Sequence, residues 1–401
     1  MNKINISNTA LELTKELISI PSFIESNNIL IVDETNLAEF VIDYVNKNIP
    51  WLNVFREPIK GTNRFNIIAY NSTKPKIIFV SHMDTVKPSG DTRVRLKPTI
   101  MRGKLFGLGS ADMKSGLACS LIAAQFSNPE IPLALVFDCD EEFYFCGIKQ
   151  FIEDFKSGYL PIEKDFKPDI VIFPEPSDLK IANGCRGCVE IAFRVIGKTA
   201  HSGKPKLGIN AIEMGVELVR QLKELLNNKN LENPLGQTTV NLAGLNGGVL
   251  QDGQIKLQAN AISNVADMLL DIRTADAKQT AEYILNKMKL IAKELKIGLE
   301  NITTNLDLKG YLNQSKELGI LENAMQLVTG NVVYRDDLSS SGYGELALLG
   351  EKLSWNTANF GPGDGISSHT IDEALNIKDL DTVINVYMEI FKLLGMQIMK
   401  K

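Results

Sequence analysis

The three histidines of this 401-residue chain mark the segments that could perform chemistry. His82 stands two residues before Asp84, directly after the apolar run 76–80, in the segment SHMDTV. A lone histidine beside an acid is more often a fixed polar contact than a metal ligand. Whether His82 binds a metal ion therefore depends on which other acids the fold brings next to it.

Acidic residues recur where predicted strands end, and the carboxyl ends of strands are where open α/β sheets bind ligands. Carboxylates crowded at one edge repel one another, so such a site must hold several protons or a cation at pH 7. The residues concerned are His82 and Asp84 after 76–80, Asp138, Asp140, Glu141 and Glu142 after 133–137 (FDCDEE), Glu175 after 169–173 (IFPEPS), and Asp112 in GSADMKSG, where it could also cap the following helix.

A divalent metal ion compensates such a cluster best, because histidine nitrogen is available beside the acids. Imidazole nitrogen with carboxylate oxygen suits zinc or its first-row neighbours, and several acids around histidines favour two ions about 3.5–4 Å apart. His201 in GKTAHSGKP and His369 in NFGPGDGISSHTIDEAL also fall in predicted turns. Each alone would be interpreted as a polar turn residue, so the metal hypothesis rests on the joint pattern.

Composition argues against several other kinds of protein. The net charge of −5 and the lack of a basic stripe disfavour a nucleic-acid partner. No apolar run approaches the roughly 18 residues of a membrane span, so we expect no membrane association and a cytoplasmic location. Five cysteines, a sparse and odd set, suit a reducing compartment. Cys185 and Cys188 form C-x-x-C without a second pair, which we interpret as part of a glycine-rich turn.

Short apolar runs predict a mostly parallel α/β sheet with helices on both faces, because strands covered on both sides are apolar almost throughout. The expected strands are 65–70, 76–80, 133–137, 169–173, 332–334 and 354–358, and the expected helices are 11–18, 35–45 and 379–394.

A second pattern begins near residue 187, where 189–196 alternates apolar and polar residues as in a sheet with one solvated face. The order that follows is strand, helix, strand, strand, helix, strand, which is typical of a ferredoxin-like α+β domain. These elements are 189–196, 210–226, 238–245, 264–272, 277–295 and 299–308. We therefore expect a catalytic domain made of 1–186 and 310–401, with residues 187–309 inserted into it.

Six motifs together resemble the co-catalytic zinc amidohydrolases and metallopeptidases, the family of acetylornithine deacetylase, succinyl-diaminopimelate desuccinylase, aminoacylase and glutamate carboxypeptidase. The motifs are HMDTV, GSADMKSG, DEE, PEPS, KTAHSGKP and GPGDGISSHTIDE, in this order between about residues 11 and 395. The resemblance implies two zinc ions per chain, with cobalt or manganese as possible substitutes. Asp112 would bridge the ions, with Glu142 and His369 completing one ion and His82 and Glu175 the other.

The resemblance also implies roles for residues outside the ligand set. Glu141 would be the general base that activates the bridging water and later protonates the leaving amine. Asp84 would orient the imidazole of His82. His201 would reach the active site of a partner subunit and stabilise the oxyanion, which implies a homodimer formed through the inserted domain. A turn histidine bonded to its own backbone is the alternative for His201.

The resemblance further implies that Arg273, Asn264 and Gly361 contact the substrate, and a guanidinium suits an amino-acid carboxylate. A solvated or salt-bridged arginine at the end of a strand is the alternative for Arg273. Asn264 is followed by Val265-Ala266-Asp267, where many relatives carry Ile-Pro, and 339–345 replaces a common Thr-Asp-Ala segment. These departures leave the substrate open. Glu175, where aminopeptidases more often carry Asp, favours deacylase or carboxypeptidase-like chemistry.

The sequence thus predicts a dimeric two-zinc hydrolase that cleaves the amide of an N-acyl amino acid or short peptide, most like acetylornithine deacetylase. A desuccinylase or a metallo-dipeptidase or carboxypeptidase is the nearest alternative. A non-catalytic dimeric binding protein of the same fold is the alternative from another class. The presence of Glu141 beside five candidate ligands disfavours it, because binding alone needs no general base.

Overall fold

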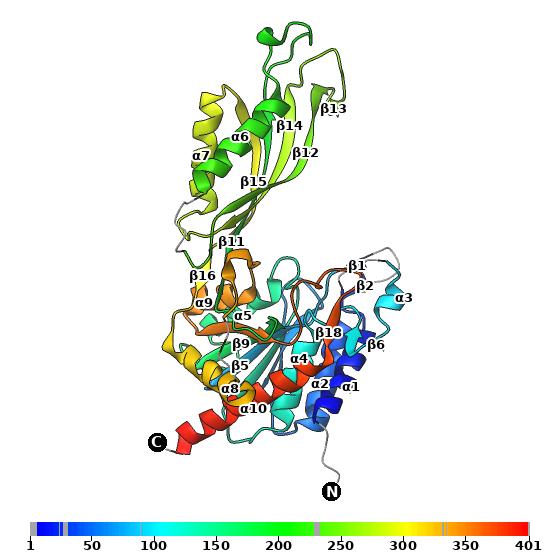
Figure 1. Cartoon of the computed structure of the whole chain (residues 1–401), viewed down its shortest axis with the longest axis vertical. Helices are drawn as coiled ribbons and strands as arrows, with labels where there is room; N and C mark the ends of the chain where they lie inside the picture. Colours follow the sequence, from blue (N-terminus) through cyan, green and yellow to red (C-terminus); the bar gives the residue numbers. More distant parts are fainter. Residues whose placement is uncertain are drawn as a thin grey trace. The chain divides into compact units, whose positions relative to one another are not determined.

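A computed structural model describes residues 6–23, 25–26, 31–88, 90–227, 233–330, 333 and 335–399. The chain forms two compact units, coloured by sequence in Figure 1. The first comprises Met1–Asn183, Asn313–Asp336 and Gly344–Lys401, and the second comprises Gly184–Leu312 and Asp337–Tyr343. The expected limits of 187 and 309 remain a proposal for where independently folding domains begin and end.

The first unit is organised around a six-stranded sheet of order β17-β9-β5-β8-β4-β3. The four strands from β17 to β8 run parallel, whereas β4 and β3 are antiparallel to their neighbours. The strand bounds are β3 Asn53–Pro58, β4 Phe65–Tyr70, β5 Ile77–His82, β8 Leu133–Asp138, β9 Ile170–Pro176 and β17 Thr357–Gly361.

Helices cover both faces of this sheet, which explains why β5 and β8 are buried along their whole length. On one face, alternate residues such as Ile77 and Phe79 join the main core, where Phe79 packs on Tyr387. The helices on this face are α1 Ile6–Ser19, α2 Thr35–Asn48, α4 Lys114–Gln125, α8 Gly319–Thr329 and α10 Ile377–Met399. On the other face lie α5 Cys146–Ser157 and α9 Glu345–Leu353, and Trp355 packs between Phe151 and Phe155 beside them.

Smaller elements complete the first unit. A three-stranded sheet of order β18-β7-β6 and a two-stranded sheet β1-β2 lie outside the main sheet. Their bounds, with the short helices, are β1 Glu25–Ser26, β2 Ile31–Val32, α3 Thr92–Arg95, β6 Thr99–Met101, β7 Lys104–Phe106, η2 Lys316–Leu318 and β18 Ala374–Asn376. Among the described residues, no helix is both long and apolar enough to cross a membrane.

The second unit is a five-stranded antiparallel sheet of order β13-β12-β14-β11-β15, with α6 and α7 packed on one face. Inward residues of β11, such as Ile191 and Phe193, alternate with half-exposed ones, as the sequence predicted. The bounds are β10 Gly184–Cys185, β11 Gly187–Ile196, η1 Pro205–Leu207, α6 Ala211–Leu226, β12 Thr239–Gln251, β13 Gln254–Lys256, β14 Val265–Thr274, α7 Ala281–Glu294, β15 Gly298–Leu308, β16 Tyr311–Leu312 and η3 Leu338–Ser340.

The expected α/β class with helices on both faces of a mostly parallel sheet is confirmed. The strand–helix–strand–strand–helix–strand plan also holds, with β13 added as a hairpin after β12. The strand expected at 354–358 begins later, at Thr357. The strand expected at 332–334 falls largely outside the described residues.

Leu135, fully buried in the middle of β8, tests the importance of this core. We expect Leu135→Ala to lower the free energy of unfolding by about 2–5 kcal/mol, because the deleted methyl groups leave a cavity. Both tryptophans, Trp51 and Trp355, lie in the first unit, so urea denaturation followed by their fluorescence reports on it. Leu327→Ala, at a 64% exposed position of α8, is the matched control and should change stability by less than about 0.5 kcal/mol. Equal effects of the two substitutions would contradict the assigned core.

Candidate metal centre

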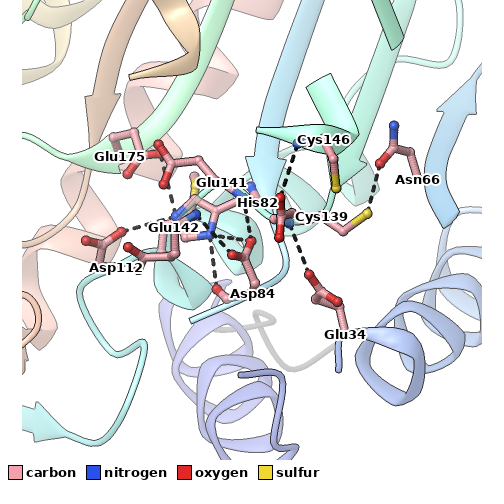
Figure 2. Close-up of polar contacts among 12 residues, drawn as sticks. Glu34, Asn66, His82, Asp84, Asp112, Cys139, Glu141, Glu142, Cys146 and Glu175 are labelled. Carbon is pink, nitrogen blue, oxygen red and sulfur yellow. Dashed lines mark hydrogen bonds and ion pairs between the residues drawn. The ribbon is translucent and has the colours of Figure 1, made fainter. Parts of the chain in front are cut away.

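The carboxyl ends of three neighbouring parallel strands position the candidate site. His82 is the last residue of β5, and Glu175 lies near the end of β9. The loop after β8 carries Glu141 and Glu142, since β8 ends beside β5 with Asp138 opposite His82. Figure 2 shows these side chains converging with Asp112 from the turn before α4.

His82, Asp112 and Glu175 form the first group that could hold a metal ion. The Nε2 atom of His82 lies 3.2 Å from Oδ1 of Asp112 and 3.7 Å from Oε1 of Glu175. The imidazole is 1% exposed, so protein groups surround it almost completely. One nitrogen and two carboxylates, each offering a ligand atom to a common point, form the donor set expected for zinc and similar ions.

His369, Glu142 and Asp112 form the second group. The Nε2 atom of His369 lies 2.9 Å from Oε2 of Glu142 and 3.5 Å from Oδ2 of Asp112. His369 comes from the loop between β17 and β18, and its φ of 63° places its backbone in the left-handed region. Such conformations cost energy in residues other than glycine and occur most often at functional sites.

Asp112 belongs to both groups, with Oδ1 facing His82 and Oδ2 facing His369. Within each group the possible ligand atoms all lie within 4.8 Å of one another. A carboxylate shared in this way fits two neighbouring divalent ions better than one. The expected helix cap was wrong: α4 begins after Met113 with no side-chain cap, because the Asp112 carboxylate faces the two imidazoles instead.

Asp84 connects the His82 ligand to the loop that carries Glu141 and Glu142. The Nδ1 atom of His82 lies 3.0 Å from the backbone oxygen of Asp84 and 3.5 Å from its carboxylate. The carboxylate oxygens of Asp84 accept the backbone N–H groups of Glu141 and Glu142, each at 3.1 Å. Asp84 therefore fixes the backbone beneath Glu141 and Glu142 as well as contacting the imidazole.

Asp140, one of the acids expected at this edge, shapes the loop instead of entering either group. Its carboxylate accepts the backbone N–H groups of Tyr144 and Cys146 at 3.2 and 3.3 Å. Its own N–H donates to Glu34 at 3.0 Å, and Arg64 forms two hydrogen bonds with the Glu34 carboxylate. This buried ion pair holds the start of the loop in place.

Asp138, another expected acid, is fully buried and also lies outside both groups. It interacts with Glu345, the first residue of α9, which is 3% exposed. Burial raises the pKa of Asp138 to about 6, and burial with the charge of Asp138 raises that of Glu345 well above its usual value. Burial therefore favours the neutral form of both carboxyl groups.

Glu373 holds the Asp112 turn from the opposite side, a function that the sequence did not reveal. Its carboxylate accepts the backbone N–H groups of Gly109, Ala111 and Asp112 at 3.0, 3.0 and 3.1 Å. Arg95 donates to the same carboxylate at 3.4 Å. The only sequence signal was its place in SHTIDE, four residues after His369, and that spacing does not indicate its partners.

The electrostatics of the site show a deficit of positive charge. Burial raises the pKa of Glu175 to about 8 and that of Glu141 well above its usual range. Burial would lower the pKa of His82, but Glu175, Asp112 and Asp84 outweigh it and raise that pKa well above 6.5. Hydrogen bonds to Asp112 and Glu142 raise the pKa of His369 to about 10. Divalent ions would replace the protons that these groups otherwise retain.

The remaining predicted site residues have other contacts. Arg273 donates to Asp271 at 2.9 and 3.1 Å, and Asn264 accepts the N–H of Leu250 at 2.9 Å. Nδ1 of His201 accepts the N–H of Gly203 at 3.0 Å, the backbone contact weighed as its alternative. These three belong to the second unit.

Gly361, at the end of β17 in the first unit, packs closely against β9. A Cβ there would lie 2.2 Å from the oxygen of Pro174, so close approach of the two strands requires glycine. Its N–H and carbonyl both bond the hydroxyl of Ser177, at 3.1 and 3.2 Å. These contacts explain by packing alone why position 361 is a glycine, whether or not it also contacts a substrate.

Residues 78–393 match the model of peptidase family M20/M25/M40. The match covers well over half of the chain. This family match identifies the chain as a hydrolase of amide or peptide bonds, and the two clustered groups described above could hold metal ions. The chain belongs to the M20/M25/M40 family, which confirms the resemblance drawn from the six motifs.

Known proteins of the family show similarity over different lengths. A probable carboxypeptidase of Emericella nidulans is 31% identical over 281 residues, which cover 66% of this chain and 62% of that protein. The acetylornithine deacetylase of Buchnera aphidicola is 25% identical over 403 residues, covering 95% of this chain and 97% of that protein. The YxeP protein of Bacillus subtilis, a dinuclear metal-binding M20 peptidase, has the same fold, with a TM-score of 0.66, 14% identity, and coverage of 98% and 99%.

We expect Glu373→Gln to weaken metal binding about 10- to 100-fold, because the turn that carries Asp112 would lose carboxylate acceptors for its N–H groups. Competition with a chromophoric chelator measures the affinity directly. Asp372→Asn is the matched control, since Asp372 is the exposed neighbour in the same loop. Equal metal affinity in both variants would show that Glu373 does not position Asp112.

Metal binding should release protons and tighten as the pH rises. The pKa values of His82 and His369 are raised, which favours protonated imidazoles that a bound ion must displace. Each proton that is displaced makes the apparent affinity rise about tenfold per pH unit. Calorimetric titration with zinc between pH 6 and 8, in buffers of different ionisation enthalpy, counts the released protons. A pH-independent affinity would contradict the assigned ligands.

Proposed function

We propose that the protein hydrolyses the amide bond of an N-acyl amino acid with two divalent metal ions, as acetylornithine deacetylase does. The observation that carries the proposal is the shared position of Asp112 between His82 and His369. The match to the Buchnera acetylornithine deacetylase over 97% of its length supports this substrate class. The dinuclear B. subtilis peptidase of the same fold supports two ions.

Bound metal ions would lower the pKa of water and polarise the scissile carbonyl. His82 and Glu175 would hold one ion, Glu142 and His369 the other, and Asp112 both. We propose zinc, for which cobalt or manganese could substitute, because the donor set combines imidazole and carboxylate.

Glu141 is the proposed general base. It lies among the ligands but belongs to neither metal-binding group, and Asp84 fixes its backbone. Its carboxylate would take the proton of the attacking water and return it to the leaving amine. Burial raises the pKa of Glu141, and the charges of Glu175 and Glu142 add to this rise. Nearby cations would offset this rise, because they favour the charged form of the carboxyl group.

The second unit would supply substrate contacts and the dimer interface. We propose that Arg273 and Asn264, with Gly361 of the first unit, contact the substrate, and that His201 stabilises the oxyanion in a partner subunit. The hydrogen bond from Gly203 to Nδ1 fixes the tautomer of a neutral His201, so that Nε2 would carry the hydrogen. A cytoplasmic location remains part of this proposal.

Carboxypeptidase activity is the second candidate, favoured by the 31% identity to the probable carboxypeptidase of E. nidulans. It uses the same hydrolytic residues and the same carboxylate at the end of the substrate. The two activities differ in what lies on the other side of the amide, an acyl group or a peptide. Kinetics with N-acetyl-ornithine, N-succinyl-diaminopimelate and a panel of dipeptides separate them.

We expect Glu141→Gln to lower kcat by a factor of at least about 10³, because the amide cannot accept the proton of the attacking water. Metal content measured by atomic spectroscopy should stay near that of the wild type, since Glu141 is not a proposed ligand. Glu163→Gln, an exposed glutamate, is the control for both measurements. Wild-type turnover in Glu141→Gln would exclude the assigned base, and failure of the whole substrate panel would favour a binding protein.

A further inference from the structure

Two cysteines bracket the loop that carries Glu141 and Glu142. Cys139 directly follows β8, and Cys146 is the first residue of α5. Both are free thiols. The hydrolytic function proposed above assigns no task to either residue.

The backbones on which the two thiols stand are in contact. The N–H of Gly147 donates to the oxygen of Cys139 at 3.0 Å, and a Cβ on Gly147 would lie 2.4 Å from that oxygen. Figure 2 shows the two sulfur atoms close together on the side of the loop away from Asp112. The neighbouring thiol of Cys146, together with burial, raises the pKa of Cys139 far above its usual value. A disulfide needs two cysteines on neighbouring backbone segments, and the contact of Gly147 with Cys139 supplies such a pair.

The two thiols differ in accessibility and in surroundings. Cys139 is fully buried, and its sulfur lies 3.4 Å from Oδ1 of Asn66. Cys146 is partly exposed, with its sulfur 3.9 Å from a guanidinium nitrogen of Arg64. A small oxidant in solution therefore has better access to Cys146 than to the buried Cys139. An accessible thiol next to a second, resolving thiol is the arrangement of reversible thiol oxidation.

We propose that Cys139 and Cys146 form a reversible disulfide with hydrogen peroxide or an organic peroxide as the oxidant, and that this bond reduces hydrolysis. The sulfur of Cys146 attacks one peroxide oxygen, the O–O bond breaks, and water (from hydrogen peroxide) or an alcohol leaves with the thiol proton. The sulfur of Cys139 then attacks the sulfenic sulfur, and the S–O bond breaks. The hydroxide that leaves takes the proton of Cys139 to form water. The two sulfurs lose two electrons in total, and the peroxide gains them.

Disulfide formation would disturb the loop because the two sulfurs, which are not bonded in the reduced protein, must approach to about 2.05 Å. The loop has little freedom to absorb this movement. Asp84 holds its centre through the N–H groups of Glu141 and Glu142, and Asp140 holds its end through that of Cys146. Displacement of about 1 Å in a positioned catalytic group can reduce turnover about 100-fold. We therefore expect the oxidised protein to turn over at least tenfold more slowly.

The remaining cysteines provide matched controls. Cys185 and Cys188 are buried in the second unit on β10 and β11, and Cys119 is buried within α4. We expect all three to stay reduced when Cys139 and Cys146 react.

Peptide mapping tests the bond itself and does not depend on the proposed function. Cleavage after glutamate at Glu130, Glu141, Glu142 and Glu153 places Cys139 in a peptide that begins at residue 131 and ends at 141 or 142, and Cys146 in the peptide 143–153. After treatment of the full-length protein with hydrogen peroxide, mass spectrometry should find these peptides joined, and a thiol reductant should separate them. Oxidation of Cys146 without joined peptides would overturn the proposal.

The effect on turnover is tested with the zinc-loaded protein and whichever substrate it hydrolyses. Peroxide should reduce turnover of the wild type and of Cys185→Ser at least tenfold, and a thiol reductant should restore it. Cys146→Ser and Cys139→Ser should keep their turnover through the same treatment. Cys146→Ser is the more informative of the two, because the position is partly exposed and tolerates serine. Joined peptides with unchanged turnover would show that the disulfide has no effect on hydrolysis, and would overturn the regulatory part of the proposal.

Discussion

The compensation of negative charge around Asp112 is the constraint on which the rest of the site depends. Its carboxylate lies between two imidazoles, and contact with His369 and His82 lowers its pKa despite burial. Glu142 and Glu175 add two further carboxylates within reach of the same nitrogens. Burying this much negative charge is costly unless protons or cations accompany it. The geometry favours metal ions over protons as the compensating charge, because each imidazole turns one nitrogen, a possible metal ligand, toward the carboxylates.

Hydrogen bonds to backbone N–H groups hold the loops of the site in position next to the sheet. The carboxylates of Asp84 and Glu373 each accept hydrogen bonds from backbone N–H groups of a loop that carries site residues. Because both acceptors are buried, leaving those N–H groups unpaired would cost about 1–3 kcal/mol each. The sheet thus fixes His82 and Glu175 directly, whereas Asp112, Glu141 and Glu142 depend on acids that do not themselves bind metal.

The sequence predicted the parts of the structure that follow from local pattern. Runs that are apolar throughout, such as 65–70 and 133–137, became central strands with nearly the expected bounds, because burial on both faces leaves that signature. The grouping of His82 with Asp112 and Glu175 followed from acids at strand ends and from the family motifs. The support from Glu373, Arg95 and Glu34 was not predictable, because these residues act on partners distant in sequence and no periodicity marks them. The cap expected from Asp112 failed because a nearby imidazole competes for the same carboxylate.

The division of the chain into two units explains why the reaction is easier to infer than the substrate. Every candidate metal ligand and the proposed base belong to the first unit, whose geometry is common to deacylation and peptide hydrolysis. Arg273, the proposed carboxylate contact, belongs to the second unit and is already paired with Asp271. A substrate carboxylate would have to compete with Asp271 for the guanidinium or share it. Under the proposed role of Arg273, substrate preference would depend on the strength of its pair with Asp271, and the hydrolytic residues form no part of that pair.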